Sequence, residues 1–333
     1  MDTQKRCLRF GAAVIVCAIL IRLMSVGAFA PLDALLNRSD VLSFLMYLET
    51  GRRASLREPD ATAPPEQPSQ APSVPPETEP ETPTFTEADL ERISIRYDGA
   101  YRPDLSSLLL SPLRWDLTEN GPAVLILHTH TTESYTPEPG EDYVSASDYR
   151  TLDESYNMLS IGDKVAEILE AGGISVLHDR ELHDYPSYNG SYPDARETAL
   201  SYLNQYPSIR LVLDLHRDAA EDSTGQVATH AQIDGADSAQ LMLVVGTDEG
   251  GLEHPDWENN LSLALQLDAQ LESLYPGLCR PISLRTERFN QDLSGHALLV
   301  EVGTAGNTHT QALRAAEALA QGILALSRGA NTQ

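Results

Sequence analysis

The stretch AVLILHTHTTESY, residues 123–135, joins five apolar residues to a run of polar ones. The apolar part, residues 123–127, has the length and composition of a strand that is buried on both faces, as in parallel sheets. The same arrangement recurs in LVLDLHRD (211–218) and in ALLVEVG (297–303). Three apolar runs that each end in histidine or carboxylate residues predict an open α/β sheet with functional groups at its strand ends.

The rest of the folded region alternates short apolar runs with helical patterns. Apolar residues at helical spacing predict four helices, over 154–171, 194–206, 257–274 and 308–326. Strands are predicted over 123–127, 174–177, 211–215 and 297–302. The Asp234-Gly235 pair predicts a hairpin between 226–233 and 241–245. This order predicts a single α/β domain over residues 91–329, with a mostly parallel sheet flanked by helices and a hairpin on one side.

The N-terminal residues 1–30 read as a cytoplasmic tip and a transmembrane helix. Basic residues at positions 5, 6 and 9 precede an apolar run that continues to Ala30, which approaches the ~20 residues a membrane span needs. Basic residues in front of the span predict that the remainder lies outside the cytoplasm. Ala28-Phe29-Ala30 also has the form of a signal-peptide cleavage site, but Pro31 directly after it favours a retained anchor.

Residues 31–90 are predicted to be an extracytoplasmic linker. From about residue 58 to Pro83 the composition is dominated by Pro and Glu with Ser, Thr and Gln, and no apolar periodicity is present. Such a segment buries too little apolar surface to offset the entropy of ordering, so we expect it to be disordered and extended.

Composition excludes some classes of partner and of site. The net charge of -26 argues against nucleic-acid binding, which needs clustered Lys and Arg. Two of the three cysteines fall in the predicted anchor, which leaves Cys279 alone in the folded region. The domain therefore has neither an internal disulfide nor a cysteine-rich zinc site, and any metal must be held by His, Asp or Glu.

The polar clusters at the three strand ends have the residue types of a catalytic zinc site. Such a site takes three protein ligands, commonly imidazoles and a carboxylate, and leaves the fourth position to water. A further carboxylate near that water can act as general base. Taken singly, each cluster is equally well read as strand-end residues that bond to the backbone, so the argument depends on their joint placement.

Several motifs in order resemble the stage II sporulation protein P family. They are HTHTTESY (128–135), HDYPSYNGSYPDAR (183–196), LDLHRDA (213–219), VVGTD (244–248), YPGLCR (275–280), RFNQDLS (288–294) and LLVEVG (298–303). The family is similar in fold to the zinc-dependent N-acetylmuramoyl-L-alanine amidases. The resemblance covers most of the chain after residue 123 and fits an anchor followed by a linker.

The resemblance implies a Zn²⁺-dependent enzyme that hydrolyses the amide between N-acetylmuramic acid and the L-alanine of the peptidoglycan stem peptide. It implies that His130 or His128, together with Glu133 and His216, holds zinc and that Glu301 is the catalytic carboxylate. The two histidines share a face if the strand continues through both, and the choice between them stays open. Whether peptide cross-bridges are also cut stays open too.

Further residues are candidates by position. Amidases of the wider class often take a ligand from a Glu at the start of the following helix, where Glu154 stands, but the motif favours Glu133. Arg217 is a candidate for binding a substrate carboxylate or oxyanion, and Asn290 and Gln291 for lining a glycan groove. Salt-bridge or capping roles explain these three residues equally well.

The family also implies a setting. It suggests a single-pass protein of the cell membrane that takes part in engulfment during sporulation, with a lytic glycosidase and a membrane scaffold protein as partners. Two other functions compete with the amidase: a non-catalytic peptidoglycan-binding module, which needs no metal set, and a two-metal hydrolase, which needs further His and Asp ligands at strand ends.

Overall fold

Strand β2, Val124–Leu127, shows how the sequence makes the layers of the fold. All four of its side chains are buried. Val124 and Ile126 belong to one apolar cluster, and Leu125 and Leu127 belong to another on the opposite face. A strand that is apolar on both faces needs cover on both, which the helices supply. The computed structural model describes residues 84–330 apart from 98, 114, 118–120, 144–148 and 224, all within one compact unit, Pro76–Gln333.

A seven-stranded sheet forms the centre of this unit, in the order β1-β10-β9-β11-β4-β2-β3. Its strands are β1 (Ile95–Tyr97), β2, β3 (Val176–His178), β4 (Leu211–Asp218), β9 (Leu241–Gly246), β10 (Ile282–Arg285) and β11 (Ala297–Thr304). Neighbouring strands are parallel except β9 and β11, which are antiparallel. The prediction of a mostly parallel α/β sheet is therefore confirmed.

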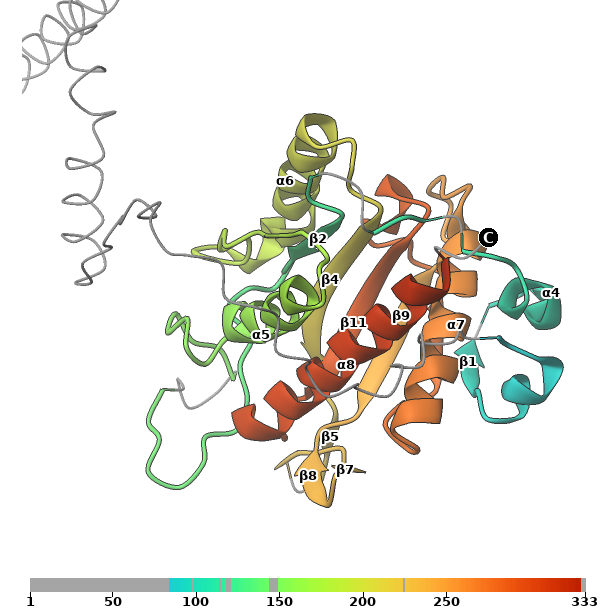
Figure 1. The fold of residues 1–333 in the computed structure, drawn as a ribbon. Helices are drawn as coiled ribbons and strands as arrows, with labels where there is room; N and C mark the ends of the chain where they lie inside the picture. The colour runs from blue at the N-terminus through green and yellow to red at the C-terminus, as the bar shows by residue number, and fades with distance from the viewer. Residues whose placement is uncertain are drawn as a thin grey trace, which may run out of the picture. The chain divides into compact units, whose positions relative to one another are not determined.

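Helices cover both faces of the sheet. Helices α5 (Met158–Ala171), α7 (Trp257–Leu274) and α8 (His309–Ala330) bury their apolar residues in the larger cluster, and α8 crosses in front of β11 in Figure 1. Helix α6 (Ser191–Gln205) packs Ala195 and Ala199 on the other face. Side chains alternate between the two faces of each strand. Those that point away from the larger cluster lie on the face that α6 covers.

Smaller elements complete the described part of the chain. They are η1 (Glu87–Glu91), α4 (Leu105–Leu109), η2 (Tyr188–Gly190) and η3 (Gln291–Leu293), and two hairpins, β5 (Glu221–Asp222) with β6 (Gly225–Gln226) and β7 (Ala231–Ile233) with β8 (Ala236–Ser238). Phe85 and Leu90 pack against the large apolar cluster.

Several predicted elements differ from the structure in their bounds, and two of these differences have a clear physical reason. The helix predicted from residue 154 begins at Met158, because the Asn157 side chain accepts a hydrogen bond from the Leu159 amide at 2.9 Å and caps it. The turn at Asp234-Gly235 is present, but it joins β7 to β8, whereas 241–246 is a central strand of the main sheet. A fully apolar strand such as β9 is buried more favourably in the sheet centre than in a surface hairpin.

The predicted anchor, residues 1–30, lies outside the described residues, as does the predicted linker up to residue 83. Within the described part of the chain, no helix combines the length and apolar character required to cross a bilayer.

Candidate active site

The pleat of two neighbouring strands brings three ionisable residues to one face of the sheet. Leu213 and Leu215 of β4 and Val300 of β11 point into the large apolar cluster. The residues between them therefore point the other way, toward the α6 side. These are Asp214, His216 and Glu301, and in the parallel pairing of β4 with β11 His216 is the register partner of Glu301.

The chain after β2 folds back over this face and supplies Glu133. The strand ends at Leu127, and residues 129–132 form turns. Glu133 is 4% exposed, and its Oε2 lies 3.5 Å from Nδ1 of His216. The backbone amide of Arg217 also donates to Glu133 Oε2, at 3.2 Å. Residues some eighty positions apart in the sequence thus meet in one buried polar cluster.

His216 lies between two carboxylates. Its Nε2 is 2.9 Å from Asp214 Oδ1, an ion-pair distance, although the direction of approach is outside the hydrogen-bond range. Asp214 is in turn fixed by the amide and the hydroxyl of Thr129, at 2.8 and 2.6 Å. Burial opposes a charge on His216, but Asp214 and Glu133 outweigh it and raise the His216 pKa well above its ordinary value.

The two glutamates of the cluster have opposite proton affinities. Burial raises the pKa of Glu133, but the contact with His216 and the charge of Arg217 outweigh it and lower that pKa to about 2. Burial raises the pKa of Glu301 to about 8, and the nearby charge of Glu133 adds to this increase. Glu301 Oε2 is buried and has no hydrogen-bond partner among the residues the structure describes. One glutamate is thus an anion at neutral pH, and the other keeps its proton there.

His130 points into the same cluster. Its ring meets that of His216 edge-on, with centroids 5.2 Å apart, and stacks on Tyr188 at 4.5 Å. Its Nδ1 is buried without a hydrogen-bond partner in the described part of the chain. Burial lowers the pKa of His130, so its imidazole is neutral at pH 7. A neutral imidazole nitrogen with no bond inside the protein is free to bind a metal or a substrate.

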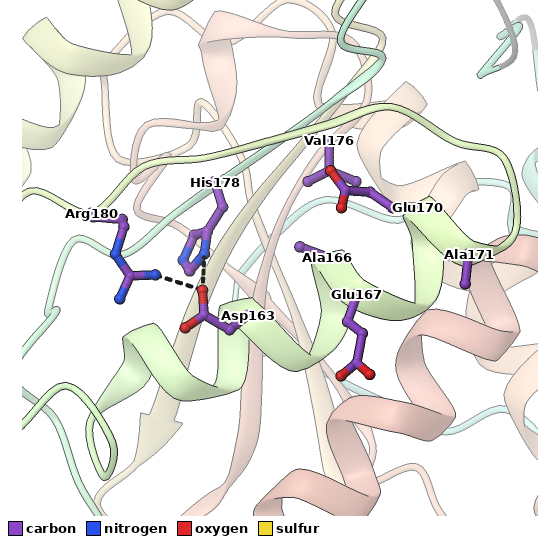
Figure 2. A pocket seen from close by; sticks show the side chains of 8 residues that line it. All are labelled: Asp163, Ala166, Glu167, Glu170, Ala171, Val176, His178 and Arg180. Atoms are coloured by element: carbon purple, nitrogen blue, oxygen red, sulfur yellow. Dashed lines mark hydrogen bonds and ion pairs between the residues drawn. The ribbon is translucent and has the colours of Figure 1, made fainter. Parts of the chain in front are cut away.

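His128 points elsewhere because β2 ends before it, so the shared face that a continuing strand would give is absent. Its Nδ1 lies 3.0 Å from the Leu215 carbonyl oxygen, and its Nε2 lies 2.8 Å from Nε2 of His178 on β3. Figure 2 shows the far side of this contact, where Asp163 of α5 bonds both His178, at 3.0 Å, and Arg180, at 2.5 Å. Both ring nitrogens of His128 are engaged within the protein.

Glu154, the alternative to Glu133, lies away from the cluster. Its carboxylate is 60% exposed and forms an ion pair with Arg180 at 2.8 Å. The structure therefore brings Glu133, and not Glu154, to His216.

The three candidate substrate-binding residues are engaged inside the protein. Arg217 is 7% exposed and donates to the carbonyl oxygens of Ser134 and Tyr149, both at 3.1 Å. The Gln291 amide accepts from the Gly246 amide and donates to the Val244 carbonyl, each at 2.7 Å. Asn290 donates to the Tyr192 carbonyl at 2.9 Å. These bonds tie Arg217 to loop residues, Gln291 to strand β9 and Asn290 to helix α6, and the substrate-binding roles of the three residues stay predictions.

Sequence reasoning missed Asp214 and Arg150. Asp214 could have been found, since a residue two positions before His216 in a strand shares its face. Arg150 follows a segment without any motif, yet it forms ion pairs with both Glu133, at 3.2 Å, and Asp184. Its role depends on how the loop folds back, which no local pattern predicts.

No group of three or more His, Cys, Asp or Glu side chains within the described residues has the arrangement of a metal site. The candidate donors His130, Glu133 and His216 are neighbours, but they are not closed around a common point.

The chain has similarity to proteins of known family and structure. A relative from Bacillus subtilis (strain 168), stage II sporulation protein P, is 30% identical over 216 residues, which is 59% of this chain and 49% of the relative. This chain thus spans about half the length of that curated relative.

Among solved structures, N-acetylmuramoyl-L-alanine amidase AmiC2 of Nostoc punctiforme is 14% identical with a TM-score of 0.36, over 64% of this chain and 97% of that one. The N-acetylmuramoyl-L-alanine amidase of Clostridium difficile 630 is 19% identical with a TM-score of 0.37, over 62% and 94%.

The family assignment follows from the sequence profile. Residues 49–324 match the profile described as Stage II sporulation protein P, and this range includes each residue of the buried cluster. The chain therefore belongs to the stage II sporulation protein P family.

Proposed function

We propose that this chain is a zinc-dependent hydrolase that cuts the amide between N-acetylmuramic acid and L-alanine in peptidoglycan. Family membership supports a role in sporulation, and the family's resemblance to amidases supports the reaction. The observation that carries the proposal is the cluster around His216. It holds an anionic Glu133, a neutral His130 and a protonated Glu301 whose Oε2 has no hydrogen-bond partner among the described residues.

The donor chemistry of the cluster fits zinc. His130 Nδ1 has no partner among the described residues, and the 3.5 Å between His216 Nδ1 and Glu133 Oε2 is close to the ~3.3 Å that separates two tetrahedral ligands with bonds of ~2.0–2.1 Å. Asp214 lies against the other nitrogen of His216, as carboxylates commonly do behind metal-binding histidines. We propose His130, Glu133 and His216 as the residues that would hold the ion.

Each residue then has a distinct role in the reaction. When bound, zinc supplies Lewis-acid chemistry, polarising the scissile carbonyl and making water more acidic. Glu301 takes a proton from the attacking water and returns it to the leaving nitrogen as the amide breaks. Asp214 orients the His216 ring, while Arg150 and Arg217 hold the charge of Glu133 in place.

Glu301 can act as a general base only in its carboxylate form, which a positive charge beside it would favour. With its pKa at about 8, the side chain is mostly protonated at neutral pH and cannot accept a proton. A cation within the cluster lowers the pKa of a neighbouring carboxyl, because it favours the charged form. A cation held by the neighbouring ligands would therefore favour the carboxylate form of Glu301, which the general-base role requires.

The proposed setting is the outer side of the cell membrane. The anchor predicted for residues 1–30 and the linker for residues 31–90 would hold a catalytic domain of residues 91–329 within reach of the cell wall. A lytic glycosidase and a membrane scaffold protein of the engulfment machinery are the proposed partners. Cell fractionation tests the anchor, which predicts extraction of the chain by detergent and not by high salt.

Analysis of muropeptide products by mass spectrometry tests the reaction. Purified full-length chain in detergent is incubated with sacculi, with and without a chelator. The proposal predicts free stem peptides that begin with L-alanine, and none when the chelator is present. Sacculi that retain the chain while every stem peptide stays attached would instead indicate the non-catalytic binding module. Release of the stem peptides as single chains, rather than as cross-linked pairs, would reveal an additional endopeptidase activity.

A further inference from the structure

A cavity of about 870 Å³ opens beside the buried cluster and has no role in the hydrolysis just described. It is lined in part by Thr132, Arg150, Asp184, Tyr185 and Tyr188. Tyr188 joins the cavity to the site, because its ring stacks on His130 with the planes 16° apart. A ligand in the cavity is therefore held directly next to the proposed reaction centre.

The cavity offers no unpaired positive charge. Arg150 is the one Lys or Arg among the described residues that line it, and it already contacts the carboxylates of both Glu133 and Asp184. Asp184 also accepts from the Thr132 hydroxyl, at 2.7 Å. The guanidinium of Arg150 is thus already engaged by two carboxylates and offers no unpaired charge to an anionic ligand.

Exposed apolar side chains gather in the same cavity. Leu152, Tyr185 and Tyr188 are 50%, 55% and 54% exposed, and they are three of the seven large hydrophobic residues that are exposed in the described chain. Arg150 lies over the Tyr188 ring, with its guanidinium carbon 4.8 Å from the centroid, and His130 stacks on that ring too. Tyr143, the third tyrosine of the lining, stacks on Tyr156 with ring centroids 4.0 Å apart. Tyr185, in contrast, is 55% exposed and has no ring contact among the described residues, so its ring is the most available to a ligand.

An aromatic surface, neutral hydroxyl groups and the lack of an unpaired cation among the described lining residues suit a neutral ring that has an apolar face and polar edges. The uncharged N-acetylhexosamine units of a glycan strand have this character. Stem peptides carry free carboxylates, for which the described lining residues of the cavity supply no unpaired cation. We infer that this cavity binds an N-acetylhexosamine ring of the glycan strand, chiefly by stacking on Tyr185, and that the stem peptide leaves the site in another direction. This inference rests on the proposed function for its substrate.

Binding of a peptide-free probe tests the inference independently of catalysis. The tetramer of N-acetylglucosamine is titrated into the full-length chain in detergent by calorimetry. Tyr185→Ala should weaken its binding about 10-fold, the size of one aromatic stacking contact, while Tyr185→Phe keeps the ring and should bind like the parent chain.

Leu252→Ala is the matched control. Leu252 is 58% exposed and follows β9, whose last residue lies beside the start of β11, so it is at the end of the sheet opposite to Glu301. This variant should bind the tetramer unchanged. Equal melting temperatures for all variants exclude loss of folding, which is expected because Tyr185 is largely exposed.

The outcomes separate this inference from the proposed function. If the parent chain binds the tetramer in a manner that depends on Tyr185 but releases no stem peptides, the hydrolase proposal fails and the glycan site stands. If stem peptides are released but Tyr185→Ala binds the tetramer as the parent chain does, the glycan site is wrong. The glycan site would also be wrong if Tyr185→Ala weakened binding of a free stem peptide but not binding of the tetramer.

Discussion

Glu301 and His216 are register partners on the adjacent parallel strands β11 and β4. At neutral pH each keeps a proton that a side chain with the ordinary pKa of its type would have lost. Burial raises the Glu301 pKa to about 8. The contacts with Asp214 and Glu133 raise that of His216 despite its burial. The metal-free cluster thus carries two protons that must leave before His216 can bind a metal and Glu301 can act as a base.

Removal of His130 is predicted to affect zinc binding, and removal of His128 is predicted to affect stability. His130→Ala removes a nitrogen that has no bond inside the described protein, so zinc content should fall from one ion per chain to near zero while the melting temperature of the metal-free chain changes little. His128→Ala breaks the contacts with Leu215 and His178, so the free energy of unfolding should fall by about 1–3 kcal/mol.

The measurements are metal analysis after dialysis and chemical denaturation in chelator. We expect His128→Ala to retain its zinc. Loss of zinc in that variant, with zinc retained in His130→Ala, would reverse the assignment.

The two candidate glutamates give a second matched pair. Glu133→Gln removes a ligand charge that Arg217 and Arg150 hold in the cluster, so it should abolish both zinc binding and release of stem peptides. Glu154→Gln breaks only an exposed ion pair with Arg180, and such pairs contribute about 0–1 kcal/mol. Zinc content and turnover of Glu154→Gln should equal those of the parent chain, and a loss of zinc there would identify Glu154 as the ligand instead.

The pKa of Glu301 predicts how stability depends on pH in the metal-free chain. Between its ordinary pKa of 4.5 and its folded value of about 8, the folded state keeps the Glu301 proton while the unfolded state loses it. The free energy of unfolding therefore falls as pH rises through this window and receives no further change from Glu301 above it. Glu301→Gln carries no such proton. In chelator, its free energy of unfolding should therefore equal that of the parent chain at pH 4 and be larger than that of the parent at pH 9 by roughly 2–5 kcal/mol.

Denaturant titrations at the two pH values check this prediction. A variant with the same stability difference at pH 4 and pH 9 would mean that the Glu301 carboxyl titrates as an exposed group does.

The centre of the sheet was predictable because its strands contain uninterrupted apolar runs. Runs such as 211–215 have few alternatives to a buried strand, and the register that follows places Asp214 and His216 together. Short strands were harder to find: β1 has only three residues, none fully buried, and β10 ends in the exposed Arg285. Their place in the sheet comes from pairing with distant strands, which no local pattern contains.

For the site, the sequence indicated which residues lie at strand ends but not where their side chains point. His128 and His130 have the same residue type and similar neighbours, and only the end of β2 at Leu127 and the turns after it separate them. Arg150 was not foreseen for the same reason, since its contact with Glu133 exists only after the loop has folded back. Folding of these loops, rather than the order of motifs, determines which side chains meet.

The most direct test of the hydrolase site is to measure zinc content and product on the same preparation of Glu301→Gln. This variant keeps the shape of the side chain but cannot accept a proton. It should hold one zinc per chain and release stem peptides ~10²–10⁴-fold more slowly than the parent, the usual contribution of a general base. His216→Ala, prepared alongside, should lose both zinc and activity. Turnover by Glu301→Gln equal to that of the parent, with zinc bound in both, would contradict the account.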